Sequence, residues 1–599
     1  MTKVISVGNE NFEAIITENR FYIDKTNFIK EWWEMADIVT LITRPRRFGK
    51  TLNMDMLKCF FSNEYKGRVD LFEGLNIWKE EKYRKLQGKY PVIFLSFAKI
   101  KQNTYEGAVK QIKNELVNLY NTFDYIMKSD LYNQNERLQY KSVCAGMDDV
   151  TAQEAIASLS NYLSRYYGKN VIILLDEYDT PMQEAYVNGY WEELVAFTRS
   201  FFNATFKLNP YLERAIMTGI TRVSKESMFS DLNNLVVITT SSKEYATSFG
   251  FTEEEVFQAL DEYGLSDKKH NVKEWYDGFV FGGIKDIYNP WSIINFLKFK
   301  ELKNYWADTS SNELISKLIK AGSVSIKETM ETLINGGVIE KRLDEQIVYN
   351  QLEKKENAIW SLLLASGYLK AVSIDVYISD DIVEIYSLTI TNNETKSMFR
   401  GMIKEWFSNV YTEKNDFLKA LILGDLDAMN NYMNEIALDT FSSFDVAGRE
   451  ESRVRPENLA SCYDCQGVAN GSSLNSSSNL YAMTRKSSRF YHGFVLGLMV
   501  EKRDDYIIKS NKESGFGRYD VMMIPRNLEI SKLPAMILEF KVMNKSKEKS
   551  LEETVSSALR QINEREYDTE LLNAGIKKES IRHYGFAFEG KKVLIGTDN

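Results

Sequence analysis

The feature that most constrains the fold is an alternation, between about residues 20 and 250, of short apolar runs with longer amphipathic stretches. The apolar runs have the length of strands and read as nearly continuous hydrophobic sequence, which is typical of strands buried on both faces. This pattern predicts a parallel sheet covered by helices. The expected strands are residues 38–42, 92–95, 171–175 and 215–218.

The length of the chain indicates several domains. At 599 residues it exceeds the size at which one hydrophobic core stops growing. Hydrophobic residues make up 44% and charged residues 27%, ordinary values that argue against extended disorder. The longest apolar runs, such as residues 171–175, are too short to cross a bilayer, and no secretory signal opens the chain. We therefore expect a cytoplasmic protein with no membrane partner.

The charge and the cysteine content exclude two further classes. The formal net charge is −9, so the protein has no general attraction for polyanions. Any binding of nucleic acid must therefore use a local basic groove. Four cysteines are too few for a disulfide scaffold in so long a chain, and we expect reduced thiols.

A basic, turn-forming segment follows the first expected strand and precedes an expected helix. Its sequence is Arg44-Pro45-Arg46-Arg47-Phe48-Gly49-Lys50-Thr51. A phosphate-binding loop needs inward-pointing backbone N–H groups and a helix N-terminus that faces the anion. Lys50 would reach the β- and γ-phosphates, the Thr51 hydroxyl would ligate Mg²⁺, and Gly49 would allow close backbone approach. Arg44 stands where the motif GxxxxGK[ST] has its first glycine, so a basic turn before an ordinary helix is the alternative.

An acidic pair ends the third expected strand. Asp176 and Glu177 directly follow the apolar residues 171–175. A P-loop fold places its Mg²⁺-associated aspartate and its water-activating glutamate at the carboxyl end of a buried strand. We therefore assign Asp176 to the metal and Glu177 to catalysis, with a solvated turn as the alternative.

The fourth expected strand leads into Thr218-Gly219-Ile220-Thr221-Arg222. A polar residue and an arginine here could sense the γ-phosphate of ATP. A helix-capping threonine and a surface arginine fit the segment equally well. The residues expected to bind the nucleotide are Arg46, Arg47, Phe48, Gly49, Lys50, Thr51, Asp176 and Arg222.

Four segments together resemble a known family. They are Tyr22-Ile23-Asp24-Lys25-Thr26, the segment from Arg44 to Thr51, Leu174-Leu175-Asp176-Glu177-Tyr178-Asp179 and Tyr288-Asn289-Pro290-Trp291-Ser292. The chain resembles the predicted AAA-like ATPases of bacteria that carry a PD-(D/E)XK-type nuclease domain at the C-terminus. An arginine-rich P-loop without its first glycine looks typical of that family. The similarity covers nearly the whole chain except about residues 448–488.

A strand near the C-terminus carries the candidate nuclease residues. Side chains alternate along a strand, so Glu539 and Lys541 share one face, and a hairpin would bring Asp520 beside Glu539. Metal-dependent phosphodiester cleavage needs carboxylates for the metal and a cation near the attacking water. All three residues match the D…ExK pattern as catalytic residues, with Asp520 and Glu539 as metal ligands. An exposed Glu/Lys pair on a half-buried strand is the alternative. Gln561 resembles the superfamily's helical glutamine, whereas Tyr567 follows it at a looser spacing than in related exonucleases.

The predicted fold is therefore α/β in class with three regions. Residues 1–260 form a P-loop NTPase domain with a parallel sheet, and residues 261–440 form a mostly helical linker or lid region. Residues 441–599 form an α/β PD-(D/E)XK-like domain. The serine- and asparagine-rich residues 448–488 are a low-complexity insertion in this last domain.

Four more residues, two within the insertion and two after it, are candidate metal ligands or site residues. Cys462 and Cys465 have zinc-ligand spacing, but no second pair accompanies them and structural zinc requires four ligands. His492 could approach the C-terminal site from an expected helix at residues 490–500. Glu501, just beyond that helix, is a further candidate metal ligand.

These patterns predict an enzyme that binds and hydrolyses ATP with Mg²⁺ and has a metal-dependent nuclease-like domain acting on DNA or RNA. The second metal is Mg²⁺ or Mn²⁺, and nucleotide binding would gate the action on nucleic acid. The alternative is a nucleotide-switched interaction protein whose C-terminal domain binds nucleic acid without cleaving it. Oligomerisation is left open by the sequence.

Overall fold

The computed structural model describes residues 2–221, 229, 232–307, 313–321, 324–343, 356–378, 382–408, 416–440, 495, 499, 505–510, 513–514, 517–526 and 533–598. The chain forms two compact units. The first comprises Met1–Ala321 and Thr332–Phe399, and the second comprises Gly322–Glu331 and Arg400–Asn599. In the described part of the chain, each helix is too short or too polar to span a membrane.

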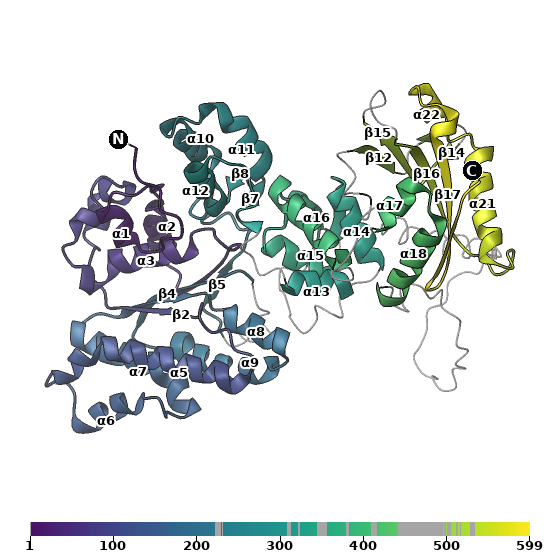
Figure 1. Cartoon of the computed structure of the whole chain (residues 1–599). Coiled ribbons are helices and arrows are strands. Elements are labelled where there is room, and N and C mark those ends of the chain that lie inside the picture. The colour runs from purple at the N-terminus through teal and green to yellow at the C-terminus, as the bar shows by residue number, and fades with distance from the viewer. Residues whose placement is uncertain are drawn as a thin grey trace, which may run out of the picture. The chain divides into compact units, whose positions relative to one another are not determined.

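The first unit is built on a five-stranded parallel sheet with the order β2-β3-β4-β1-β5 (Figure 1). Strands β1 to β4 confirm the four strands predicted from the sequence, whereas β5 was not predicted. This strand is short and half-exposed at the sheet edge, so it lacks the continuous apolar pattern of the others. The strands are β1 (Val39–Thr43), β2 (Val92–Ser96), β3 (Val171–Asp176), β4 (Leu212–Gly219) and β5 (Leu235–Ile238).

Helices cover both faces of this sheet, as the amphipathic stretches predict. Figure 1 shows α3 above the sheet and α5 and α7 below it. In α7 the buried Ala152, Ile156, Leu159 and Leu163 recur at helical spacing, which aligns them on one face. The helices up to β4 are α1 (Phe12–Thr17), α2 (Asn27–Met35), α3 (Lys50–Phe61), α4 (Glu81–Arg84), α5 (Tyr105–Thr122), α6 (Gln134–Ser142), α7 (Asp149–Tyr167), α8 (Thr180–Asn188) and α9 (Trp191–Phe202).

The middle of the chain is largely helical, as predicted, but it also contains two small three-stranded sheets. The first sheet has the order β6-β8-β7 and the second β10-β11-β9. Helices α14 and α16 each have residues in both units. The elements are β6 (Phe251–Thr252), α10 (Glu253–Glu262), α11 (Lys269–Tyr276), β7 (Phe279–Phe281), β8 (Ile284–Tyr288), α12 (Pro290–Phe299), α13 (Glu313–Ala321), α14 (Val324–Ile334), β9 (Ile339–Arg342), α15 (Glu356–Ala365), β10 (Leu369–Ile378), β11 (Ile382–Ile390) and α16 (Asn393–Ser408).

The second unit contains a mixed five-stranded sheet with the order β12-β15-β16-β17-β18. β16 and β17 are parallel, and the other neighbours are antiparallel. The predicted α/β fold of the C-terminal region and the predicted hairpin between Asp520 and Glu539 are confirmed. The elements are α17 (Asp416–Leu423), α18 (Leu426–Thr440), β12 (Tyr506–Ser510), β13 (Glu513–Ser514), β14 (Gly517–Arg518), β15 (Val521–Pro525), β16 (Ala535–Val542), α21 (Leu551–Glu564), α22 (Thr569–Asn573), β17 (Ile581–Glu589) and β18 (Lys592–Gly596).

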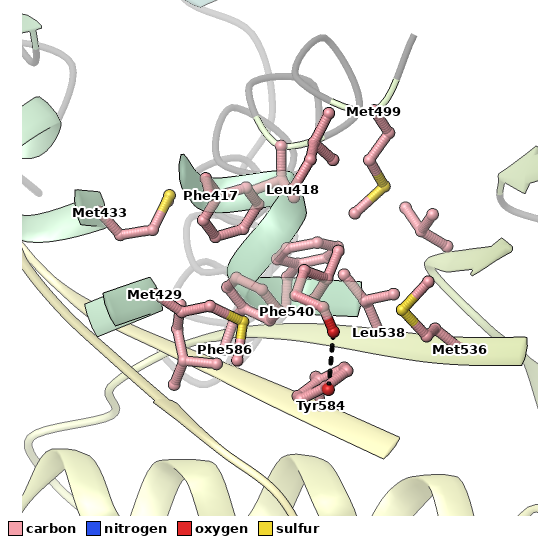
Figure 2. Close-up of a cluster of buried hydrophobic side chains, with 14 of the residues drawn as sticks. Phe417, Leu418, Met429, Met433, Met499, Met536, Leu538, Phe540, Tyr584 and Phe586 are labelled. Carbon is pink, nitrogen blue, oxygen red and sulfur yellow. Dashed lines mark hydrogen bonds between the residues drawn. The ribbon is translucent and has the colours of Figure 1, made fainter. Parts of the chain in front are cut away.

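The two faces of this sheet pack against different helices. Met536, Leu538 and Phe540 of β16 point toward α17 and α18, where they join a core with Phe417 and Met429 (Figure 2). The alternate residues of β16 face α21 instead. α17 and α18, which the sequence interpretation placed in the middle region, therefore pack on the C-terminal sheet.

Two asparagines on α18 bind the backbone of the edge strand β18. The side-chain amide of Asn430 donates to the carbonyl of Ile595 (2.9 Å) and accepts from its N–H (2.7 Å). Asn434, one turn later, makes the same pair of bonds with Val593 at 2.7 and 2.9 Å. Each amide thus replaces a neighbouring strand, and the pair satisfies edge groups that would otherwise be open to another chain.

The expected helix at residues 490–500 and the insertion at residues 448–488 lie outside the described residues, except for Val495 and Met499, which are helical and buried. Cys462 and Cys465 also lie outside them.

We predict that Asn434→Ala lowers the free energy of unfolding of the second unit by about 1–3 kcal/mol, because the substitution leaves the Val593 N–H and carbonyl without their partners. Asn434→Asp, which keeps the acceptor and loses the donor, should cost less. Guanidinium denaturation of the full chain measures both effects. Asn431→Ala, on the exposed side of the same helix, is the control and should change little. Equal effects of the substitutions at residues 431 and 434 would contradict the proposed role of the amide.

Candidate functional site

The loop between β1 and α3 lies at the carboxyl edge of the first sheet. α3 begins at Lys50, directly after Gly49, whose φ of 79° lies in the left-handed region. A Cβ atom added to Gly49 would meet no atom within 4 Å, so the backbone conformation, not space, requires glycine here. Arg47 also has a positive φ, 65°. The chain therefore turns sharply twice before the helix starts.

Lys50 is held inside this loop. Its side chain is 6% exposed, and its Nζ donates to the carbonyls of Arg44 (3.1 Å) and Pro45 (2.9 Å). Burial lowers the pKa of Lys50, and the nearby charges of Glu177 and Asp176 partly oppose that shift. The ammonium group thus already has two acceptors, and an incoming phosphate would compete with these carbonyls for its protons.

Asp176 and Thr51, the two predicted Mg²⁺ ligands, are in direct contact. The Thr51 hydroxyl donates to Oδ2 of Asp176 (2.8 Å), and the Thr218 hydroxyl donates to Oδ1 (2.5 Å). Burial raises the pKa of the Asp176 carboxyl, against the effect of these two hydroxyls. A carboxylate and a hydroxyl are the hard oxygen ligands that Mg²⁺ prefers, so the donor set fits this ion.

Glu177 projects into the same region from an unusual backbone conformation. Its φ is 51°, which costs a non-glycine residue about 1–2 kcal/mol. The Thr180 hydroxyl donates to its Oε2 at 3.1 Å. Strained residues concentrate at functional sites, and the catalytic role of Glu177 stays a prediction.

A cavity of about 370 Å³ connects these groups, within the range of small-ligand sites. Its charged and polar lining includes Arg46, Arg47, Lys50, Thr51 and Glu177. Its apolar lining includes Ile15, Phe21, Ile23, Phe251, Pro290 and Ile294.

Arg44, which departs from the usual P-loop motif, is fully buried and does not line the cavity. Its guanidinium donates to the carbonyls of Thr43 (2.9 Å) and Thr239 (2.7 Å) and lies 4.9 Å from the ring centroid of Phe281. Burial lowers its pKa to about 9. The arginine therefore ties the phosphate loop to the segment that follows β5.

The other basic and aromatic residues of the loop have separate partners. Arg46 donates to Gln183 (3.3 Å), and the Arg47 guanidinium lies 4.3 Å from the ring centroid of Trp291. Phe48 is buried, with its ring centroid 4.7 Å from that of Phe279, so it anchors the loop as well as lining the cavity. Arg222, the predicted γ-phosphate sensor, lies outside the described residues.

Asp179 is a residue whose role the sequence did not reveal. Its Oδ2 accepts from the backbone N–H groups of Ile220 and Thr221, both at 2.9 Å, and from the Thr221 hydroxyl at 3.0 Å. A Cβ atom on Gly219 would lie 2.6 Å from the ring of Tyr178 and 2.8 Å from Asp179, so glycine is required there. Asp179 thus fixes the backbone that leads to the expected sensor.

In the second unit, the hairpin of β15 and β16 brings Asp520 beside Glu539, as predicted. The Phe540 N–H donates to Oδ2 of Asp520 at 2.9 Å. Glu539 is 4% exposed and accepts a short hydrogen bond from Nε2 of Gln561 on α21. Lys541 donates to the Ser557 hydroxyl at 3.2 Å. Glu539 and Lys541 therefore share the face toward α21.

The electrostatics of this carboxylate pair fit a divalent cation. Burial raises the pKa of Asp520 to about 6. Burial and the Asp520 charge raise the pKa of Glu539 well above its usual value, and burial lowers the pKa of Lys541. Oε2 of Glu539 is buried and has no hydrogen-bond partner among the described residues. A cation at this oxygen would compensate a buried charge that is otherwise costly.

Tyr567 also belongs to this cluster, despite its loose spacing from Gln561. Its hydroxyl accepts from Nε2 of Gln561 at 3.2 Å, the same nitrogen that binds Glu539. Tyr567 follows Glu566, whose φ of 51° turns the chain back after the end of α21. His492 and Glu501 lie outside the described residues.

A third group of carboxylates was not expected from the sequence. One oxygen each from Glu253, Asp277 and Asp286 lie within 4.8 Å of one another. The Lys273 ammonium lies 2.5 Å from Glu253 and 3.8 Å from Asp286. A positively charged side chain of the protein therefore already compensates part of the negative charge of this cluster. Burial and the adjacent Asp286 raise the pKa of Asp277 to about 7.

We predict that Asp277→Asn stabilises the protein at pH 8. A carboxyl whose folded pKa is raised binds its proton more tightly when folded, so stability falls as pH rises from about 4 to 7. The amide imitates the neutral acid and should gain about 1–2 kcal/mol at pH 8, less than full linkage because the carboxyl is half-exposed. Thermal unfolding at pH 5 and pH 8 measures the difference, with exposed Asp267→Asn as the control. A larger gain at pH 5 than at pH 8 would refute the assignment.

Comparison with known proteins identifies two domain families. Residues 6–229 match the family described as predicted AAA-ATPase, and residues 486–598 match the PD-(D/E)XK nuclease superfamily. An uncharacterized protein in the vnfD 5′ region of Azotobacter chroococcum mcd 1 is 25% identical over 338 residues. The match covers 55% of this chain and 59% of the relative, so the chain spans less than two thirds of that protein's length. The chain thus carries a predicted AAA-ATPase-like domain followed by a PD-(D/E)XK nuclease superfamily domain.

Proposed function

We propose that the first unit binds and hydrolyses ATP with Mg²⁺. The observation that carries this proposal is the contact of Thr51 with Asp176, close to Lys50 and Glu177, where Lys50, Thr51 and Glu177 line a single cavity. These four residues come from two chain segments that meet only because their strands end at the same sheet edge. The predicted AAA-ATPase family match supports the assignment.

Each side chain would have a distinct part in the reaction. Lys50 would leave the loop carbonyls and neutralise charge on the phosphates, and backbone N–H groups at the start of α3 would add to it. Mg²⁺ held by Thr51 and Asp176 would supply charge neutralisation on the phosphate oxygens. Glu177 would orient the attacking water and accept its proton. The apolar residues that line the cavity would contact the base and exclude water.

We predict that Lys50→Ala abolishes ATP binding, whereas Glu177→Gln retains binding and loses turnover by about 100-fold or more. Lys50 contributes to the ground state, while Glu177 acts on the water in the transition state. Calorimetry with ATP and Mg²⁺ measures binding, and phosphate release measures turnover. Glu192→Gln, on an exposed position of α9, is the matched control. Parental turnover in Glu177→Gln would remove this residue as the base. Tight ATP binding with negligible turnover in the wild type would favour the nucleotide-switched interaction protein.

We also propose that the second unit cleaves DNA or RNA with Mg²⁺ or Mn²⁺. The carrying observation is the buried Oε2 of Glu539, without a hydrogen-bond partner among the described residues and next to Asp520. Asp520 and Glu539 would hold the metal, which activates water and neutralises phosphate charge when bound. Lys541 would position the attacking water or stabilise developing charge. Gln561 and Tyr567 would orient Glu539 through the hydrogen bonds that connect them.

The nuclease proposal predicts different losses at the three positions. Asp520→Asn and Glu539→Gln should lose both Mn²⁺ binding and cleavage, whereas Lys541→Ala should keep Mn²⁺ binding and lose cleavage. Calorimetry with Mn²⁺ and degradation of labelled linear, circular, single- and double-stranded substrates, with and without ATP, measure the two properties. ATPase activity without nucleic acid should survive all three changes. Equal residual cleavage by wild type and variants would mean a contaminant or another site.

A further inference from the structure

The carbonyls of the phosphate loop are held from two directions. Lys50 binds the carbonyls of Arg44 and Pro45 from inside the loop. The next carbonyl, that of Arg46, accepts from outside: Nε1 of Trp306 donates at 3.1 Å and Nδ2 of Asn289 at 3.3 Å. Both donors belong to the part of the sequence that follows β5, the last strand of the parallel sheet.

Trp306 is rigidly placed for this contact. Its side chain is 1% exposed, and its ring centroid lies 5.7 Å from that of Phe279 and 5.3 Å from that of Tyr368. Its backbone N–H donates to Oε1 of Glu394 at 2.6 Å. Packing and this hydrogen bond together fix the direction of the indole N–H.

Glu394 joins the two donors of the Arg46 carbonyl. Its Oε1 binds the backbone of Trp306, and its Oε2 accepts from the Ser292 hydroxyl at 2.8 Å. Ser292 lies in the first turn of α12, where its N–H donates to the side chain of Asn289, the residue that caps this helix. The buried Glu394 carboxylate thus binds Trp306 directly and Asn289 through Ser292, and these are the two residues that donate to the Arg46 carbonyl.

Glu394 is also the second residue of α16. This helix runs from Asn393 to Ser408, and its residues from Arg400 onward belong to the second unit. The helix that carries the anchor is therefore one of the two helices, with α14, in which the chain passes from one unit to the other.

We propose that Trp306 is a positioning residue for the phosphate loop and that Glu394 couples the loop to α16, so that α16 responds to bound nucleotide. The inference rests on the proposed ATP site. When Lys50 turns to a phosphate, it releases the Arg44 and Pro45 carbonyls. The Arg46 carbonyl keeps its outside donors, which then hold the loop in its binding shape. A displacement of the Arg46 carbonyl would reach Glu394 through Trp306, whose indole N–H binds the carbonyl and whose backbone N–H binds Glu394.

The first test removes the indole N–H and keeps the ring. Trp306→Phe should raise the KM for ATP about two- to tenfold, the worth of one hydrogen bond, and change kcat less than twofold. Trp360→Phe is the matched control, because Trp360 is also fully buried but its Nε1 has no hydrogen-bond partner among the described residues. A purely structural cost would move both variants alike. Equal KM values for the two variants would overturn the proposal.

A double-mutant cycle tests the link to Glu394. Glu394→Gln keeps an acceptor oxygen but loses the charge, and it should raise the KM in the same direction as Trp306→Phe. The combination should be less than multiplicative if the two residues act on one carbonyl, whereas Trp306→Phe with Trp360→Phe should be multiplicative. Independent effects in both cycles would overturn the coupling.

Hydrogen exchange tests the response of α16. Protection of residues 393–399 should change when ATP and Mg²⁺ are added to the wild type at saturation. The change should be absent in Lys50→Ala and at least halved in Trp306→Phe at saturating ATP. An unchanged response in Trp306→Phe would overturn this inference alone. A wild type that does not bind ATP would instead refute the proposed function, and the inference would fall with it.

Discussion

The first unit depends on the buried Asp176 carboxylate at the end of β3. β3 and β1 are not neighbours, because β4 lies between them. Asp176 nevertheless binds Thr51 at the start of α3 and Thr218 of β4, so three elements meet at one side chain. Burial of a carboxylate is costly, and two hydroxyl groups offset only part of the cost. The position of the phosphate loop relative to β3 therefore rests on a group that a cation would stabilise further.

Much of this architecture was predictable from local pattern. Continuous apolar runs identified four of the five parallel strands, and β5 escaped because an edge strand is half-exposed. The acidic residues after β3 were found because a buried strand rarely ends in carboxylates. The roles of Arg44 and Asp179 were not predictable, because each binds backbone groups of a segment at least 40 residues away. Such bonds leave no periodic signal in the sequence.

In the C-terminal site, too, some features were predictable from the sequence and others were not. Alternation along β16 placed Glu539 and Lys541 on one face, and pairing with β15 brought Asp520 to Glu539. Tyr567 reaches the site through a backbone turn after α21, so its spacing along the sequence was misleading. The packing of α17 and α18 on this sheet was also hidden, since an apolar helix face indicates burial but not the surface that covers it.

Four buried carboxylates differ in the hydrogen-bond donors that bind their oxygens. The side chains of Asp179 and Glu394 each accept at least three hydrogen bonds, including two from backbone N–H groups, and they hold chain segments in place. Among the described residues, the Asp176 side chain accepts from hydroxyl groups alone, which can also ligate a metal, and Glu539 keeps an oxygen without a partner. A backbone N–H cannot give up its acceptor without cost, whereas a hydroxyl can turn toward a new ligand. The donors therefore distinguish Asp176 and Glu539 from Asp179 and Glu394, whereas Asp520, also expected to bind a cation, accepts from the backbone N–H of Phe540.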